Sequence, residues 1–94
     1  MNTANPQLEG LYLALSALCD LLVEKGVVER EELHDALQKA ERTAVAGSHV
    51  DGDTDSRRKA IAFPIHFLLL ASKCTARGEV PSFHELTREI GRRG

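Results

Sequence analysis

The sequence predicts an all-α protein: one four-helix bundle-like domain made of two helical hairpins. The chain has 94 residues, enough for one domain with a modest core, and is 43% hydrophobic and 28% charged. It has one Tyr, three Phe and no Trp, so Leu and Ala supply most of the apolar side chains, as is typical of packed helices. Apolar residues also recur every three or four positions, the period of a helix.

The first helix is expected from about Gln7 to Lys25, with residues 1–6 as a flexible N-terminus. Gly26 is expected to end it, because glycine adopts the left-handed conformation that follows many helices. Most of its circumference is apolar, so it needs partners on more than one side. Five leucines form a seam with the spacing of a coiled coil: Leu8, Leu11, Leu15, Leu18 and Leu22.

The second helix is expected from about Glu29 to Ala46, with acidic residues in its first turn that suit the helix dipole. The segment 47–55 is rich in Gly, Ser and Asp and is interpreted as the loop between the two hairpins. The predicted buried face of the second helix consists of small or aliphatic residues: Leu33, Ala36, Leu37, Ala40 and Ala44.

The third helix is expected from Asp55 or Ser56 to Arg77, kinked or broken near Pro64, because proline removes a helical hydrogen bond. Its polar positions form one narrow stripe: Lys59, His66, Lys73 and Arg77. Gly78 is expected to end it.

A capping box, Ser82-Phe83-His84-Glu85, predicts the start of the fourth helix, because the Ser and Glu side chains can each accept a hydrogen bond from a free amide. This helix is expected to run from Phe83 to about Ile90, followed by a frayed tail at 91–94.

The two halves of the chain differ in charge, although the net charge is only −2. Residues 1–55 carry four basic and eleven acidic side chains, a net charge of −7, and residues 56–94 carry eight basic and three acidic ones, a net charge of +5. The simpler interpretation is that the halves face each other. The alternative is a nucleic-acid- or anion-binding accessory protein that uses the basic second half: Arg57, Arg58, Lys59, Arg88, Arg92 and Arg93. The acidic total charge disfavours it.

No pattern in the sequence indicates an enzyme, a cofactor or a metal site. The alternating aspartates at 51–55 resemble the opening of a calcium loop, but Ser56 and Ala62 stand where such a loop needs Gly and Glu. No two histidines have the i,i+4 spacing of a helical zinc pair. A site assembled from His66, Cys19 and Cys74 is a minor alternative; the two cysteines are expected to be buried, reduced side chains.

We therefore expect a small non-catalytic protein–protein interaction or regulatory module that binds itself, as a homodimer, or another protein. The expected interface consists of Leu11, Leu15, Leu18 and Leu22, with Phe63, Phe67 and Leu70 as a second surface. The competing interpretation is a monomer in which the first and third helices are sandwiched centrally. The longest apolar run, residues 60–71, is shorter than the roughly 20 residues of a membrane span, so a cytoplasmic protein without membrane contact is expected.

Overall fold

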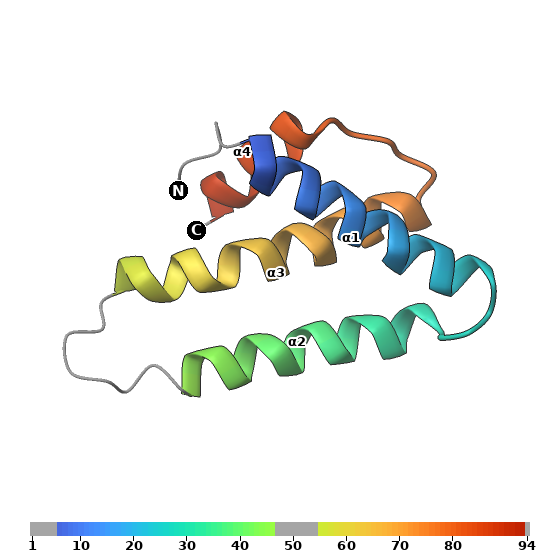
Figure 1. Cartoon of the computed structure of the whole chain (residues 1–94), viewed down its shortest axis with the longest axis horizontal. Coiled ribbons are helices and arrows are strands. Elements are labelled where there is room, and N and C mark those ends of the chain that lie inside the picture. Colours follow the sequence, from blue (N-terminus) through green and yellow to red (C-terminus); the bar gives the residue numbers. More distant parts are fainter. Residues whose placement is uncertain (1–5, 47–54, 94) are drawn as a thin grey trace.

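A computed structural model describes residues 6–46 and 55–93 and contains four helices in chain order. They are α1 (Pro6–Glu24), α2 (Arg30–Ala46), α3 (Asp55–Ala76) and α4 (Phe83–Arg93) (Figure 1). No strand occurs in these two described ranges, so the predicted all-α, bundle-like fold is confirmed. Apart from Pro6, which begins α1, and Asp55, which begins α3, the expected flexible N-terminus and inter-hairpin loop lie outside the described residues.

α3 is the central helix, and each of the other three packs against it. α2 lies along one side of α3, and α1 and α4 lie on the other (Figure 1). The core is centred on Phe67, which is fully buried. The ring of Tyr12 from α1 lies 5.2 Å from that of Phe67 and 5.8 Å from that of Phe83, measured between centroids. The other buried members of the cluster are Leu70, Ala71, Cys74, Leu86 and Ile90.

Both predicted glycine stops are confirmed. Gly26 and Gly78 have positive φ angles of 73° and 74°. After α1, the Val27 amide donates to the Leu22 carbonyl oxygen at 3.0 Å and the Gly26 amide donates to that of Val23 at 3.0 Å. The same two bonds follow α3, from Glu79 to Cys74 and from Gly78 to Thr75. This paired pattern is the Schellman motif, which satisfies the last carbonyls of a helix.

The capping box of α4 is also confirmed. The Glu85 amide donates to Ser82 Oγ, and the Ser82 amide donates to Glu85 Oε1, both at 3.1 Å. These contacts hold the pKa of the Glu85 carboxyl below its usual value. α4 remains helical to Arg93, so the expected end at Ile90 is three residues too early.

Pro64 does not interrupt α3, which is one helix from Asp55 to Ala76. The proline ring has no N–H for the carbonyl of Ala60, the residue four positions earlier. Ala60 is exposed, so water can satisfy that carbonyl without a break in the helix. The prediction was a kink or a break near Pro64: the break is wrong, and the kink stays a prediction.

α2 is rotated relative to the prediction. Ala36 and Ala40 are exposed, whereas Arg30, His34 and Glu41 are half-buried. The side that faces α3 combines these three polar residues with Leu33, Leu37 and Ala44. The polar side chains can face inward because α3 supplies hydrogen-bonding partners for them.

Candidate interaction surface

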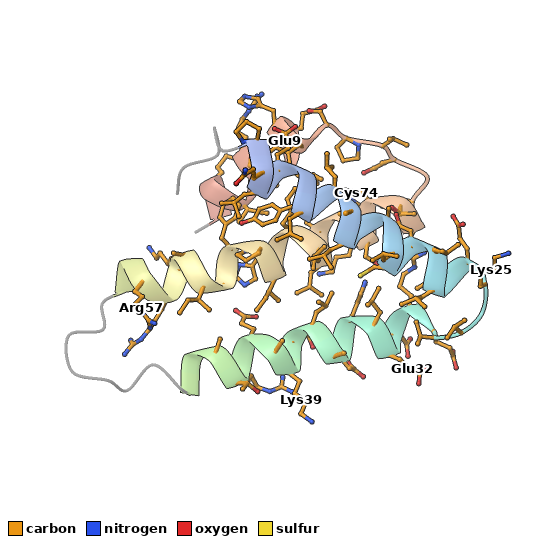
Figure 2. The ribbon with its side chains drawn as sticks, viewed as in Figure 1. Glu9, Lys25, Glu32, Lys39, Arg57 and Cys74 are labelled. Carbon is orange, nitrogen blue, oxygen red and sulfur yellow. The ribbon has the colours of Figure 1, made fainter. Side chains whose placement is uncertain are left out.

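Four of the five heptad leucines of α1 lie on its outer side, whereas Leu8 is half-buried. Leu11 is 53% exposed, Leu15 39%, Leu18 55% and Leu22 40%. We call these four residues the leucine row. Figure 2 shows α1 on the side of α3 away from most of α2, and α1 contacts α3, more sparsely α2 and, through Tyr12, Phe83 of α4. The structure therefore places the four predicted α1 interface residues together on one accessible helix face.

α1 attaches to the fold through its other side. Tyr12 is its one buried residue, and its ring is the anchor to the aromatic cluster. The polar residues Ser16 and Asp20 are half-buried on the attached side, and the Thr75 hydroxyl lies 3.3 Å from Asp20 Oδ2. The usual amphipathic arrangement, with leucines inward and polar residues outward, is thus partly reversed in α1.

The second predicted interface, formed by Phe63, Phe67 and Leu70, is not on the surface of the protein. Phe67 is fully buried and Leu70 is 7% exposed, both in the core cluster, and Phe63 is partly buried against that cluster. The physical reason is the central position of α3, whose apolar circumference is covered by α1, α2 and α4. The competing interpretation of a sandwiched helix therefore holds for α3 but not for α1.

A buried polar cluster joins α2 to α3. Ser72 on α3 is 2% exposed, and its hydroxyl accepts a hydrogen bond from Arg30 Nη1 at 2.7 Å. Arg30 Nη1 also donates to the Ser72 carbonyl oxygen at 2.8 Å. His34 Nε2 lies 2.9 Å from Ser72 Oγ. The guanidinium only donates, so the Ser72 hydroxyl keeps its proton free to donate to His34 Nε2 in the tautomer that leaves Nε2 unprotonated.

Partial burial, followed by the positive charges of Lys73 and Arg30, lowers the pKa of His34, and Asp35 opposes this shift. The lowered pKa favours the neutral imidazole, whose Nε2 can accept the Ser72 proton in one of its two tautomers. A Ser–His contact at this distance has the form of a nucleophile and its base. Ser72 is too deeply buried for a substrate carbon to reach Oγ, so the contact joins two helices instead.

Sequence reasoning did not find this cluster, because Arg30 and His34 lie 42 and 38 residues from Ser72. The one feature of the sequence that indicated a polar contact there was a hydroxyl residue, Ser72, next to the apolar run of α3. The facing residues on α2 could be chosen only once the rotation of that helix was known.

Among the residues that the structure describes, which do not include His49, the histidines and cysteines do not gather into a metal site. His66 Nε2 lies 2.8 Å from Glu41 Oε2, which directs it toward α2 and away from the cysteines. Within 6–46 and 55–93, no group of three or more His, Cys, Asp or Glu side chains could hold a metal ion. Cys19 and Cys74 are free thiols, and burial raises the pKa of each. Asp51 and Asp53 of the loop that resembles a calcium site lie outside the described residues, whereas Asp55 begins α3.

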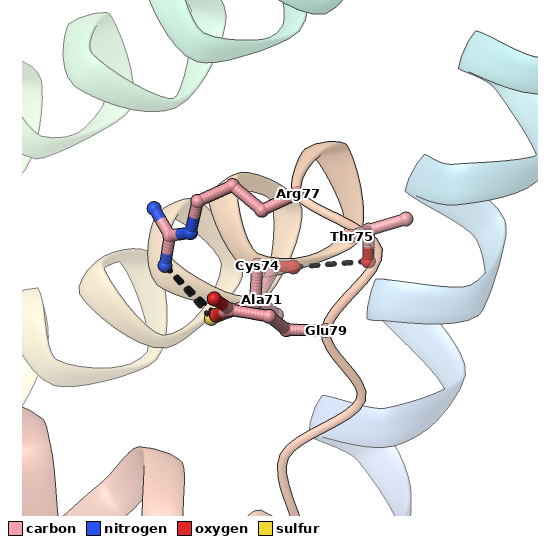
Figure 3. A network of polar contacts seen from close by, with 5 residues as sticks. All are labelled: Ala71, Cys74, Thr75, Arg77 and Glu79. Atoms are coloured by element: carbon pink, nitrogen blue, oxygen red, sulfur yellow. Dashed lines mark hydrogen bonds and ion pairs between the residues drawn. The ribbon is translucent and has the colours of Figure 1, made fainter.

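Polar contacts surround the end of α3 (Figure 3). Arg77 Nη2 donates to Glu79 Oε1 at 3.1 Å and to Cys74 Sγ at 3.6 Å. The hydrogen bond with Arg77 lowers the pKa of Glu79. Arg77 and Glu79 are both exposed. We infer that these contacts stabilise the turn around Gly78 and do not activate the protonated Cys74 thiol.

The basic residues of the second half lie on two helices. Arg57, Arg58 and Lys59 are exposed in the first turns of α3. Arg88 and Arg92 are exposed on α4, where Arg92 forms an ion pair with Glu89. Arg93 is the last residue of that helix. The positive charges thus come from two elements and include a locally neutralised arginine.

Two helical segments are long and apolar enough to cross a membrane by length and composition alone: Pro6–Glu24 and Arg57–Ala76. The second belongs to the central helix of the fold, a kind of segment that commonly meets this criterion. Comparison of the chain with protein-family models, with curated proteins and with solved structures found no match.

Proposed function

We propose that this protein is a small, non-catalytic, cytoplasmic interaction module that associates with a second copy of itself through the leucine row of α1. The observation that carries the proposal is the outward position of four heptad leucines on a helix whose polar residues Ser16 and Asp20 face inward. Exposed apolar patches of this kind mark interaction sites in small proteins. A surface that pairs with itself about a two-fold axis is the commonest oligomer interface.

The exposed leucines supply a modest driving force. Full burial of a leucine side chain contributes roughly 1.5–3 kcal/mol, and these four are already about half buried. Covering the remainder contributes about 0.75–1.5 kcal/mol per leucine, or about 6–12 kcal/mol for two copies. Association itself costs on the order of 4–15 kcal/mol. The leucine row alone therefore supports weak pairing, of micromolar order or weaker.

The charge of α1 favours a protein partner over a membrane surface. The helix carries Glu9, Asp20 and Glu24 and no basic residue; Lys25 follows its last residue. Helices that bind membrane surfaces are rich in Lys and Arg on the polar face, because cellular membranes are anionic. A second leucine row, by contrast, offers a matching uncharged surface.

Light scattering after gel filtration tests the proposal. We expect a mass above the 10.3 kDa of one chain at micromolar concentration. The double substitution Leu18→Glu and Leu22→Lys should return the protein to a monomer, since it places an i,i+4 ion pair on the helix and charges in the interface. A monomer of the unaltered protein at every accessible concentration contradicts the proposal.

Val80→Lys is the control. Val80 is 96% exposed and lies in the connection between α3 and α4, not on α1. The Val80→Lys substitution adds a charge at an exposed apolar residue without changing the leucine row, so it should leave the mass of the assembly unchanged. Loss of association in this variant would assign the interface to another part of the surface.

A further inference from the structure

α2 is attached to the rest of the fold differently from the other three helices. Among the described residues, the hydrophobic cluster around Phe67 takes its members from α1, α3 and α4 and none from α2. Between Arg30 and Ala44, every residue of α2 is half-buried or exposed. The aromatic core can therefore stay packed when α2 is removed from α3.

α2 covers a face of α3 that the aromatic cluster does not use. Ser72 lies on this face and contacts the first turns of α2. His66 lies on the same face, with its Nε2 atom 2.8 Å from Glu41 Oε2. Leu69 is 9% exposed and stands three residues from both Ser72 and His66, so it shares their side of the helix. Release of α2 would bring this face of α3 into contact with water.

The docked position of α2 brings three basic side chains around one buried hydroxyl. Arg30 Nη1 donates to Ser72 Oγ at 2.7 Å, and His34 Nε2 lies 2.9 Å from the same oxygen. Partial burial, then the charges of Lys73 on α3 and Arg30 on α2, lowers the pKa of His34, and Asp35 on α2 opposes this shift. A protonated His34 also has no acceptor for the Ser72 hydroxyl. Docking of α2 is therefore weakest when His34 is charged.

The second histidine of this interface responds to protonation in the opposite sense. A protonated His66 would form an ion pair with Glu41, which favours docking. The side chains of His66 and Glu41 are 45% and 32% exposed, and ion pairs in contact with water contribute little to stability. The cluster at His34 surrounds a nearly fully buried hydroxyl and therefore has the larger effect.

We propose that α2 is an acid-released cover of α3: protonation of His34 detaches α2 from the face around Leu69 and Ser72, while α1, α3 and α4 stay packed around Phe67. The inference does not depend on the proposed self-association, because α2 and α1 lie on different sides of α3 (Figure 1). Most of the stability of a 17-residue helix comes from tertiary packing, so a released α2 also loses protection of its backbone amides.

The direction and size of the pH response follow from the lowered pKa of His34. Docking favours the neutral imidazole, so it is at full strength above about pH 6.5, the usual pKa of a histidine in an unfolded chain. As the pH falls below this value, the docking equilibrium weakens by up to about tenfold per pH unit, until the pKa of the docked His34 is reached.

Regional hydrogen exchange of the full chain tests the inference. The protein is exchanged near pH 7.5 and near pH 5.5, its peptides are analysed by mass spectrometry, and the rates are corrected for the intrinsic effect of pH on exchange. We expect the protection of α2 peptides to fall several-fold, by at most about tenfold, at the lower pH. Peptides of α4 and of the Phe67 region of α3 should keep their protection.

Two variants and one direct titration complete the test. His34→Gln keeps an acceptor for Ser72 but does not titrate, so its α2 protection should be equal at the two pH values. His66→Gln is the matched control and should keep the fall. In the unaltered protein, the His34 ring should titrate below about pH 6.5 in an NMR spectrum.

Four results would overturn the inference. The first is equal α2 protection of the unaltered protein at the two pH values, and the second is a fall that persists in His34→Gln. The third is a parallel loss of protection in α3 and α4, which would mean that acid unfolds the whole domain. The fourth is a His34 ring that titrates at or above about pH 6.5.

Discussion

Replacing Ser72 by alanine tests whether the buried polar cluster anchors α2 to α3. The substitution removes one oxygen atom that accepts a hydrogen bond from Arg30 at 2.7 Å and lies 2.9 Å from His34 Nε2. A hydrogen bond to a charged group contributes about 1.5–3 kcal/mol and a neutral one about 0.5–1.5 kcal/mol. Arg30 keeps its second bond to the Ser72 carbonyl oxygen, which limits the loss.

We therefore expect Ser72→Ala to lower the free energy of unfolding by about 2 kcal/mol. In a domain of this size, that change corresponds to a fall in Tm of roughly 8–16 °C. Urea unfolding followed by circular dichroism measures the change. It is best made in the Leu18→Glu/Leu22→Lys background, because the proposed self-association would make stability depend on protein concentration.

Thr87→Val is the matched control. Thr87 is 6% exposed, but its hydroxyl donates within its own helix, to the His84 carbonyl oxygen at 3.0 Å. Its loss should cost less than about 1 kcal/mol. A double-mutant cycle of Ser72→Ala with Arg30→Met should also give a coupling energy of about 1 kcal/mol. A cost for Ser72→Ala equal to that of the control, without coupling to Arg30, would refute the reasoning.

Two further predictions concern protonation and helix termination. The lowered pKa of His34 means that the unfolded chain takes up a proton before the folded one, so stability should be constant above about pH 6.5 and fall as the pH decreases through the folded-state pKa. Unfolding of the unaltered protein and of His34→Gln, which keeps an acceptor for Ser72, should diverge in this window. Gly78→Ala should destabilise the protein by about 1–2 kcal/mol through its positive φ, whereas Gly91→Ala, inside α4, should stabilise it by up to about 1 kcal/mol.

Each of these two predictions has an outcome that would contradict it. If His34→Gln has the same pH dependence as the unaltered protein, His34 does not control stability in that range. At both glycines an added Cβ meets no atom within 4 Å, so the two alanine substitutions differ in backbone conformation and not in steric contact. Equal effects at Gly78 and Gly91 would contradict the assignment of the cost to the left-handed backbone.

The sequence by itself determined the features that depend on neighbours along the chain. Gly26 and Gly78 end helices, and Ser82 and Glu85 begin one, through contacts that span at most five residues. The number of helices, their approximate bounds and the leucine spacing of α1 follow from the same short-range patterns. Local rules suffice there because both partners of each contact lie within about one helical turn.

Only the tertiary structure decided which side of each helix faces inward. α1 and α3 are apolar around most of their circumference, so their sequences do not define a unique buried side. In the packed structure Tyr12 is the buried residue of α1 and the leucine row is exposed. Phe67 and Leu70 of α3 lie in the core. Ser72 obtained its partners on α2 in the same way, from residues about 40 positions distant. Contacts between distant residues depend on how the helices pack together, which no local pattern in the sequence records.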